Sequence, residues 1–453
     1  MNKIDTEIIK TSCLDLSYEG KGVCRDGDRV IFVTGMFPGD EGDVEILYKR
    51  NGVFFGRIKK LDKLSENRIK PVCKVCTACG GCSFQAYDYR AQLEFKRKLV
   101  SEQFRKVGHM EVDVLPTLGM DDPYHYRNKI QVPFGWDRWH QNVVYGFYKE
   151  GTHCIVSNND CSIEDRLGNK IISEFCKILN ELHIDPYNEK TGEGYIRHAL
   201  VRTSKRFEEN MLVVVSKSPY IPRKDELIDL IKARIPEVTT FVENINPCKT
   251  NVILGEKEKV LFGKGYIEDI LCGVKFRISA KSFYQTNPTM TELLYNMAME
   301  YASITPNDVV FDAYSGIGTI GMIAAKKGAK KVIAVEVVED AVHDALCNAK
   351  ANGINNFTEI CGDATEFLVE QAKLGTEFDV IFMDPPRKGS TEEFINSVKL
   401  IKPNKIVYVS CNPSTLARDC ALFADTYVVS KVQPVDLFPQ TSHVETVVLL
   451  TLK

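Results

Sequence analysis

One cysteine and two acid–base side chains offer the most reactive chemistry in this sequence. Cys411 follows the apolar run 405–409, which predicts a buried strand that delivers Ser-Cys-Asn-Pro to the edge of a sheet. A thiolate is nucleophilic near neutral pH and can leave again, so it can add reversibly to an electron-poor carbon such as C6 of a pyrimidine. A free cysteine can also be a small packing residue, and the surrounding motifs must decide between the two.

Substitution at C5 of a pyrimidine also needs a base, because the C5 proton must leave after the new group has been added. His443 and Glu445 both lie at the start of the last apolar strand. A carboxyl in a closed site can have its pKa raised towards neutral pH, so Glu445 is chemically adequate. Both residues remain candidates from the sequence alone.

A glycine-rich loop joins two predicted strands. The run 309–312 leads into Gly316 and Gly318, which let the backbone approach a ligand at the N-terminus of a helix. The next strand ends at Glu336, where a carboxylate can accept both ribose hydroxyls. Because Gly321 completes a G-x-G-x-x-G pattern, a nicotinamide-binding domain is a rival interpretation.

Two further strand ends favour a methyltransferase over a nicotinamide enzyme. The run 378–383 ends in Asp384 followed by two prolines, which hold the turn rigid and point the carboxylate at the ligand edge of the sheet. Class I methyltransferases carry this element, and dehydrogenases do not need it. Asp363 ends the third strand, where such folds present a side chain to adenine.

The elements that must position these residues change along the chain. Residues 1 to about 60 read as short strands separated by glycine turns, which predicts a small β-barrel. Strands dominate from about 125 to 280, and residues 90–107 predict a basic helix. From about 283 onward strands alternate with helices, which indicates a parallel, doubly wound sheet.

Composition restricts the setting of this chemistry. The 453 residues exceed one ordinary core, and no apolar signal or membrane segment is apparent, so we expect a cytoplasmic protein of two or three domains without a membrane partner. The net charge of −3 hides basic stretches at 49–70 and 90–106, which are compatible with RNA binding. Neither protein partners nor oligomeric state can be predicted.

The remaining cluster of reactive residues is C-x2-C-x2-C-x2-C, formed by Cys73, Cys76, Cys79 and Cys82. In a reducing compartment, four thiols this close favour a metal site over disulfides. Zinc and an iron–sulfur cluster are both possible from the spacing.

Taken together, these motifs resemble the RNA uracil-C5 methyltransferase family over most of the chain. The resemblance is carried by Ser-Phe-Tyr-Gln-Thr-Asn (282–287), Asp-Pro-Pro-Arg (384–387), Ser-Cys-Asn-Pro (410–413) and His-Val-Glu-Thr-Val (443–447). It implies an α/β protein with a TRAM-like β-barrel RNA-binding domain at 1–62, a mixed α+β central domain at 63–282, and a class I, Rossmann-like methyltransferase domain at 283–453. The basic helix at about 90–107 is expected to pack on the catalytic domain.

The resemblance also implies roles for individual residues. Gln285, Tyr314, Glu336 and Asp384 correspond to the S-adenosylmethionine site, Cys411 to the nucleophile and Glu445 to the base. The relatives' ligand pattern for a [4Fe-4S] cluster selects Cys73, Cys79, Cys82 and Cys161, leaves Cys76 as a spare, and keeps zinc as the alternative.

The resemblance further implies the substrate. We expect methylation of C5 of a uridine in structured RNA, with 23S rRNA favoured over tRNA because relatives with both a barrel and a cluster act on large-subunit rRNA. Two rival interpretations stay open, namely an amino-group methyltransferase and a non-catalytic RNA-binding factor.

Overall fold

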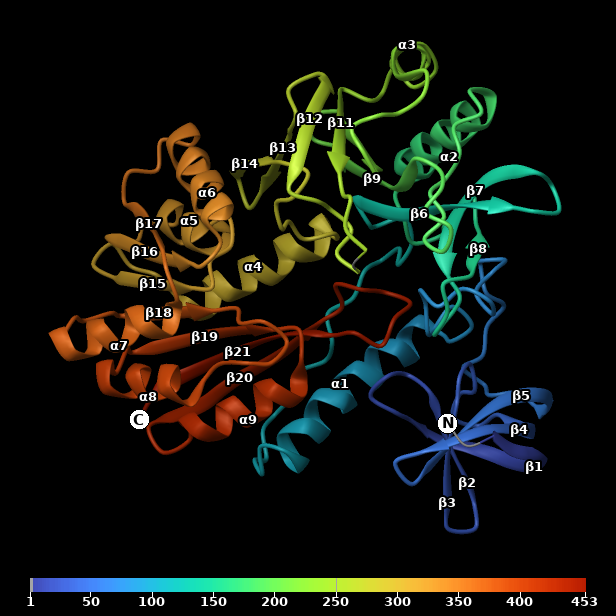
Figure 1. The fold of residues 1–453 in the computed structure, drawn as a ribbon. Helices are drawn as coiled ribbons and strands as arrows, with labels where there is room; N and C mark the ends of the chain where they lie inside the picture. The colour runs from blue at the N-terminus through green and yellow to red at the C-terminus, as the bar shows by residue number, and fades with distance from the viewer. Residues whose placement is uncertain (1–2, 250) are drawn as a thin grey trace.

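The computed structural model describes residues 3–249 and 251–453. The N-terminal part of the chain is a closed five-stranded barrel (Figure 1). Alternate residues of its strands, such as Ile31, Val33, Val44 and Ile46, fill the interior, as the period of a β-strand requires. The barrel confirms the expected N-terminal fold. In the order β1-β2-β3-β5-β4, its strands are β1 (Lys3–Leu16), β2 (Gly22–Asp26), β3 (Arg29–Val33), β5 (Val53–Lys63) and β4 (Glu41–Arg50).

The central part is a mixed α+β unit, as expected. Helices α2 (Arg166–Glu181) and α3 (Lys224–Arg234) accompany a seven-stranded sheet, and a hairpin of β13 (Ile267–Leu271) and β14 (Val274–Ile278) follows it. The sheet has the order β12 (Lys257–Phe262), β11 (Thr240–Ile245), β10 (Glu209–Ser216), β9 (Ile196–Ser204), β6 (Lys129–Asp137), β7 (Asn142–Tyr148) and β8 (Ile155–Ser157).

The C-terminal part is a second seven-stranded sheet in which five neighbouring strands are parallel, β21 runs antiparallel to them, and β20 pairs antiparallel with β21. Its order is β17 (Phe357–Cys361), β16 (Lys331–Glu336), β15 (Val309–Ala313), β18 (Val380–Met383), β19 (Lys405–Ser410), β21 (Glu445–Leu452) and β20 (Tyr427–Val435). The order reverses beside β15, and the crevice at such a reversal is where open α/β sheets bind ligands.

Helices cover both faces of this sheet because its strands are apolar on both sides. Val310 and Phe382 face one core, which also contains residues of α4 (Pro288–Ala302), α5 (Thr319–Lys326) and α6 (Glu339–Ala351). Phe311 and Ile381 face the other core, under α7 (Ala364–Leu374), α8 (Glu392–Ile401) and α9 (Pro413–Phe423).

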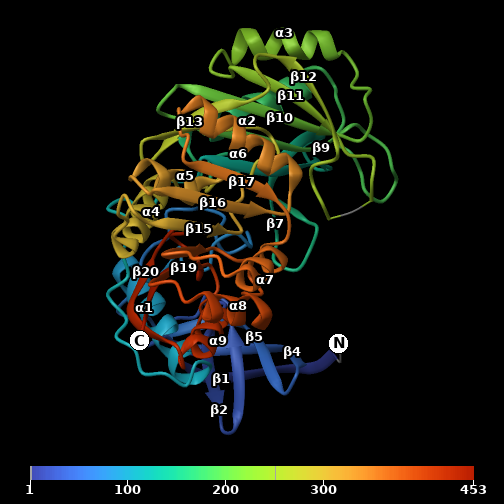
Figure 2. The same ribbon diagram turned by 90° about the vertical axis from the view of Figure 1, so that its left-hand side faces the viewer.

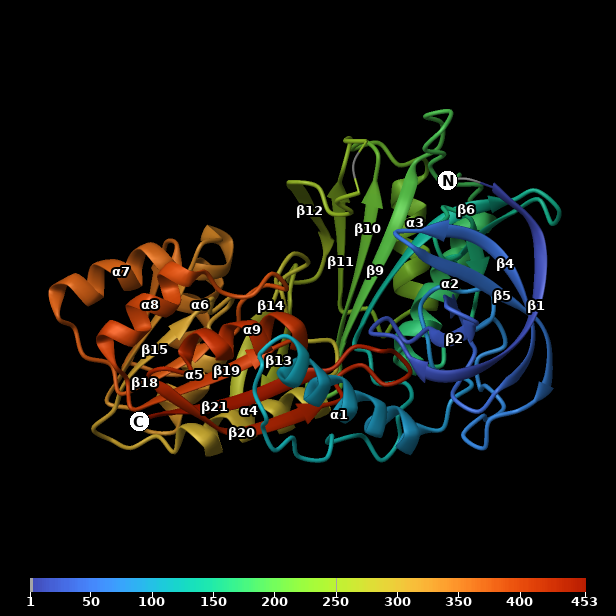
Figure 3. The same ribbon diagram turned by 90° about the horizontal axis from the view of Figure 1, so that it is seen from below.

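Helix α1 (Tyr89–Lys106) connects the parts of the molecule. It packs against α9 and β20, and it lies between the barrel and the C-terminal sheet (Figures 1 and 3). Lys96 is fully buried and forms an ion pair of 2.5 Å with Asp436, which is buried too. Lys98 pairs with Asp15 of the barrel at 2.7 Å. Two of the basic residues of this helix therefore take part in packing between parts of the protein.

The barrel and the central sheet lie above one another on one side of the molecule, and the C-terminal sheet lies beside them (Figures 1 and 2). Lys21 of the barrel pairs directly with Glu150 of the central part at 3.2 Å. None of the helices in the described residues is long and apolar enough to cross a membrane.

Candidate active site

A cavity of about 1040 Å³ opens at the carboxyl edge of the C-terminal sheet. Eight of the nine residues that the sequence predicts for the catalytic and cofactor sites line it: Gln285, Tyr314, Gly316, Glu336, Asp363, Asp384, Cys411 and Glu445. Gly318 is the exception. It is the N-cap residue of α5 and has a φ of 74°, so it contributes to the backbone shape of the loop without lining the cavity.

Strand register explains why these residues meet. Ala313 lies opposite Met383 on one side and Val335 on the other, so Tyr314, Asp384 and Glu336 follow at adjacent strand ends. On the antiparallel side, Ser410 lies opposite Thr446. One step further along that register, Cys411 comes opposite Glu445. The predicted nucleophile and base therefore share one end of neighbouring strands.

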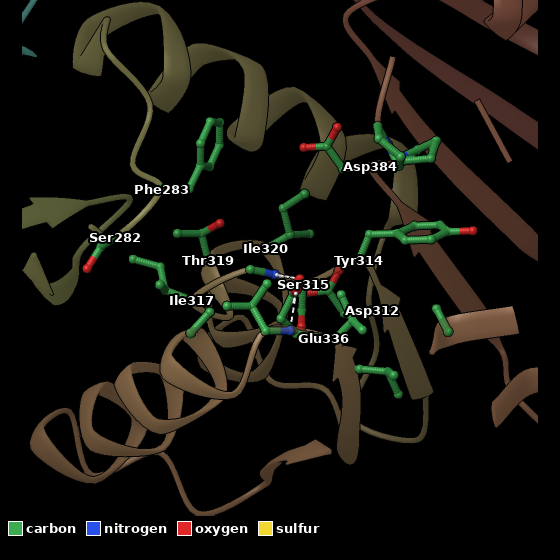
Figure 4. A pocket seen from close by; sticks show the side chains of 18 of the residues that line it. Ser282, Phe283, Asp312, Tyr314, Ser315, Ile317, Thr319, Ile320, Glu336 and Asp384 are labelled. Atoms are coloured by element: carbon green, nitrogen blue, oxygen red, sulfur yellow. Dashed lines mark hydrogen bonds between the residues drawn. The ribbon is translucent and has the colours of Figure 1, made fainter. Parts of the chain in front are cut away.

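The cofactor side of the cavity is built around the glycine loop (Figure 4). The two carboxylate oxygens of Glu336 accept hydrogen bonds from the backbone N–H groups of Gly316 (3.0 Å) and Val338 (2.9 Å). A carboxylate oxygen has a second lone pair, so the same group can still accept a ribose hydroxyl. Tyr314 adopts a φ of 63° at the start of the loop, and its hydroxyl lies 3.1 Å from the Ser390 hydroxyl.

Asp363 has a structural role in addition to its predicted role in binding adenine. Its Oδ1 accepts hydrogen bonds from the N–H groups of Thr365 (2.8 Å) and Glu366 (3.2 Å), and thereby caps α7. Capping of this kind satisfies otherwise unpaired N–H groups of the first helical turn. The residue also lines the cavity, so its second oxygen is the one that can face a ligand.

The catalytic side concentrates acidic groups around the thiol. Loss of solvent raises the pKa of Cys411 to about 11, and the charges of Glu445 and Asp384 act in the same direction. Glu445 is buried, and this burial, together with Asp384, raises its pKa well above the ordinary value. Loss of solvent also raises the pKa of Asp384 to about 7. A carboxylate with a raised pKa is a stronger base than an ordinary one.

Arg387 supplies the opposing charge. Its guanidinium lowers the pKa of Cys411 and that of Glu445, and so favours their ionised forms. Partial burial, followed by the charges of Arg387, Lys96 and Arg127, lowers the pKa of His443. A lowered pKa leaves that imidazole neutral and makes it a weaker base, which favours Glu445 of the two candidates.

The structure adds residues that the sequence analysis did not select. Asp312, at the end of β15, accepts a hydrogen bond of 2.7 Å from the N–H of Gly321, and burial raises its pKa to about 8. Its position at a strand end before the glycine loop was a signal that could have identified it. The Tyr18 hydroxyl of the barrel donates a hydrogen bond to Asn412, which follows the predicted nucleophile. No local sequence pattern predicts a contact between residues 394 positions apart.

The cysteine cluster lies apart from this cavity. Cys73, Cys79, Cys82 and Cys161 line a separate cavity of about 50 Å³, and Cys76 lines it too. None of the five forms a disulfide bond. Within residues 3–249 and 251–453, no three His, Cys, Asp or Glu side chains form a group that could hold a metal ion.

A doubly wound sheet with a reversed final strand, a glycine loop and an acid at the end of the second strand defines a class I S-adenosylmethionine-dependent methyltransferase. Comparison with known proteins identifies the family. The model of the tRNA (uracil-5-)-methyltransferase family matches residues 248–453. An uncharacterized RNA methyltransferase of Listeria monocytogenes is 42% identical over 446 residues, which cover 98% of this chain and 97% of that protein.

Other relatives agree over the full length. An uncharacterized RNA methyltransferase of Staphylococcus aureus is 40% identical over 455 residues. The match covers 100% of this chain and 100% of that protein. The crystal structure of the Pyrococcus abyssi tRNA (uracil-54, C5)-methyltransferase in complex with S-adenosyl-L-homocysteine matches with a TM-score of 0.77 and 26% identity, over 98% of this chain and 100% of that one.

The chain belongs to the RNA uracil-C5 methyltransferase family. It is an S-adenosylmethionine-dependent enzyme that acts on RNA, which confirms the predicted cofactor and reaction class. The nicotinamide, amino-group and non-catalytic interpretations find no support in these relatives.

Proposed function

We propose that the enzyme methylates C5 of a uridine through a covalent bond between Sγ of Cys411 and C6 of the uracil. The observation that carries this proposal is the strand register that brings Cys411 opposite Glu445 in the same cavity as Glu336. A nucleophile, a base and a cofactor-binding carboxylate then surround one space that is large enough for a flipped nucleotide and the cofactor.

The proposed reaction has three steps. The Cys411 thiolate forms a bond to C6, and the electrons of the C5–C6 double bond make C5 nucleophilic. C5 then takes the methyl group from the sulfonium of S-adenosylmethionine, whose S–CH3 bond breaks to leave S-adenosylhomocysteine. Finally the Glu445 carboxylate removes the C5 proton, the double bond forms again, and the thiolate leaves C6.

For the substrate we propose a uridine of 23S rRNA, because the chain combines an N-terminal barrel with the cysteine cluster. A specific observation favours tRNA as the second candidate: the P. abyssi structure with a TM-score of 0.77 is that of a tRNA methyltransferase. We further propose that the barrel is a TRAM-type RNA-binding domain and that the enzyme works in the cytoplasm, where both RNAs are found.

Methyl mapping distinguishes these substrates. The rRNA and tRNA of a deletion strain should be digested and compared with the parent by mass spectrometry. Loss of 5-methyluridine from a 23S rRNA fragment, and its return when the gene is restored, is the expected result. Loss from tRNA alone would replace 23S rRNA by the second candidate.

We also propose that Cys73, Cys79, Cys82 and Cys161 hold a [4Fe-4S] cluster that is structural or positions RNA. These thiols surround one small cavity, and thiolates are the ligands of such clusters. They do not converge into a ligand group, so we expect the loop that carries the first three to close around the metal. The cluster has no part in the methyl transfer.

Metal analysis of anaerobically purified protein tests this assignment. A brown protein with about four irons per chain is expected. Cys79→Ser should lose the metal, and the matched control Cys76→Ser should keep it. Stoichiometric zinc without visible absorbance would replace iron, and equal loss in both variants would make Cys76 a ligand.

A further inference from the structure

The turn between β1 and β2 is a rigid structure that presents one tyrosine. The Ser17 N–H donates to the Lys21 carbonyl (2.8 Å), and the Gly20 N–H donates to the Ser17 carbonyl (2.8 Å). The Ser17 hydroxyl accepts a further bond from the Lys21 N–H (3.1 Å). These bonds close the turn on itself, with Tyr18 near its tip.

This turn packs against both chain segments that carry the catalytic residues. The Tyr18 hydroxyl donates to Oδ1 of Asn412 at 3.2 Å, and Asn412 follows the nucleophile directly. On the other side, a Cβ added to Gly20 would lie 2.9 Å from the Phe84 ring and 3.1 Å from Cβ of Ser442, three residues before the base. The positive φ of Gly20, 77°, and this close approach together explain a glycine here.

Tyr18 nevertheless remains partly exposed to solvent. Although its hydroxyl is held, 44% of the residue is exposed. It is not among the residues that line the cavity, but it lies within electrostatic reach of Cys411, Arg387 and Glu445. Tyr18 therefore lies beside the active site, partly exposed to solvent and with its hydroxyl held by Asn412.

We propose that Tyr18 is the contact by which the barrel holds RNA at the mouth of the active site, its ring stacking on the base beside the target uridine. The target itself must leave its stack to reach Cys411, and this exposes a face of the neighbouring base. Aromatic side chains stack on bases without regard to sequence. Because the hydroxyl is already bound to Asn412, little side-chain freedom remains to be lost when RNA binds. This inference rests on the proposed function of the cavity.

The test uses the full-length enzyme and a short RNA stem-loop copied from the site at which the deletion strain loses its methyl mark. Wild type is compared with Tyr18→Ala, Tyr18→Phe and the control Tyr220→Ala. Tyr220 is a 65% exposed tyrosine of the central part that does not line the cavity. The measured quantities are KM for RNA, kcat, the Kd for RNA, and calorimetric affinity for S-adenosylmethionine.

We expect Tyr18→Ala to raise KM and Kd for the stem-loop about 5- to 150-fold, the range for loss of one base–aromatic stack. Cofactor affinity should not change. Tyr18→Phe keeps the ring and should stay within about threefold of wild type, and Tyr220→Ala should equal it. An abasic nucleotide beside the target uridine should weaken wild type as much as Tyr18→Ala does, and should weaken Tyr18→Ala no further.

Unchanged RNA affinity of Tyr18→Ala would overturn the proposal, as would full additivity with the abasic substrate. If Tyr18→Ala also lost cofactor affinity, its role would be structural. Should that variant not fold, wild type that is indifferent to the abasic nucleotide would overturn the proposal equally. The absence of a covalent adduct in wild type would refute the mechanism at Cys411 instead, and the Kd measurements would still report on Tyr18.

Discussion

At the scale of single residues, the cavity divides into a cofactor side and a chemical side. The Glu336 carboxylate accepts hydrogen bonds from two backbone N–H groups, and it still has lone pairs that can accept the ribose hydroxyls. Glu445 and Cys411 occupy a poorly solvated corner in which Arg387 is the opposing charge. The two sides can therefore be tested separately by substitution.

Glu336→Ala should weaken S-adenosylmethionine binding by about 1.5 to 3 kcal/mol, the usual value of a hydrogen bond to a charged group. Calorimetry measures this loss, and RNA affinity should change little. The matched variant Glu336→Gln keeps one acceptor oxygen and should lie between wild type and alanine. Cofactor affinity of Glu336→Ala equal to that of wild type would refute the assignment.

Glu445→Gln should stop the reaction after methyl transfer, because the C5 proton then has no base to receive it. With cofactor present, a methylated protein–RNA adduct should accumulate and survive denaturing electrophoresis. His443→Ala is the control and should turn over without the adduct. If the two variants behaved in the opposite way, the imidazole would be the base.

At the scale of elements, the sequence predicts strand ends better than strand neighbours. The runs before Glu336, Asp384 and Cys411 are apolar and end in a polar residue, so their role at a parallel sheet edge follows from local pattern. The meeting of Cys411 with Glu445 depends on β21 entering between β19 and β20. That pairing is set by contacts distant in sequence, and only the resemblance to relatives anticipates it.

The same limit applies to α1. Its charges suggest a solvent-exposed face, yet Lys96 is buried against Asp436, which begins the segment leading to Glu445. No periodicity in the helix distinguishes this lysine from Lys98, which is about half exposed and pairs with Asp15. Burial of one and exposure of the other follow from how the barrel, α1 and the sheet pack.

Lys96→Met should lower the free energy of unfolding by about 3 to 5 kcal/mol, because it leaves the Asp436 carboxylate buried without its partner. Urea denaturation measures the change. Lys98→Met, the control on the same helix, should cost less than about 1 kcal/mol, as exposed ion pairs do. Equal changes in the free energy of unfolding for the two substitutions would show that the buried pair stabilises the protein no more than the exposed one.

At the scale of the whole molecule, the barrel is fastened to the catalytic part by α1 and by the turn that carries Tyr18. The RNA surface is then expected to run from the barrel to the cavity mouth. We expect Lys59 and Lys60 of β5 to belong to this surface, although they also pair with Glu45 (3.5 Å) and Asp62 (2.7 Å).

Neutralising Lys59 and Lys60 to glutamine should reduce the salt dependence of RNA binding. If both contact phosphates, the slope of log K against log salt should become shallower by roughly 1.4 to 1.8. Filter binding over a salt series measures the slope. Lys257 and Lys259 of β12, which are exposed on the central sheet, provide the matched double variant and should leave it unchanged. An unaltered slope in the first variant would mean that those lysines only face solvent.

The central claim is that Cys411 bonds to C6 of the target uracil. The direct measurement is mass spectrometry of the peptides left after wild-type enzyme reacts with S-adenosylmethionine and RNA containing 5-fluorouridine. Fluorine at C5 cannot be removed as a proton, so elimination is blocked. The account predicts a methylated fluorouridine adduct on the peptide that contains Cys411, and none with Cys411→Ala. Absence of any adduct in wild type, or an adduct on another residue, would contradict it.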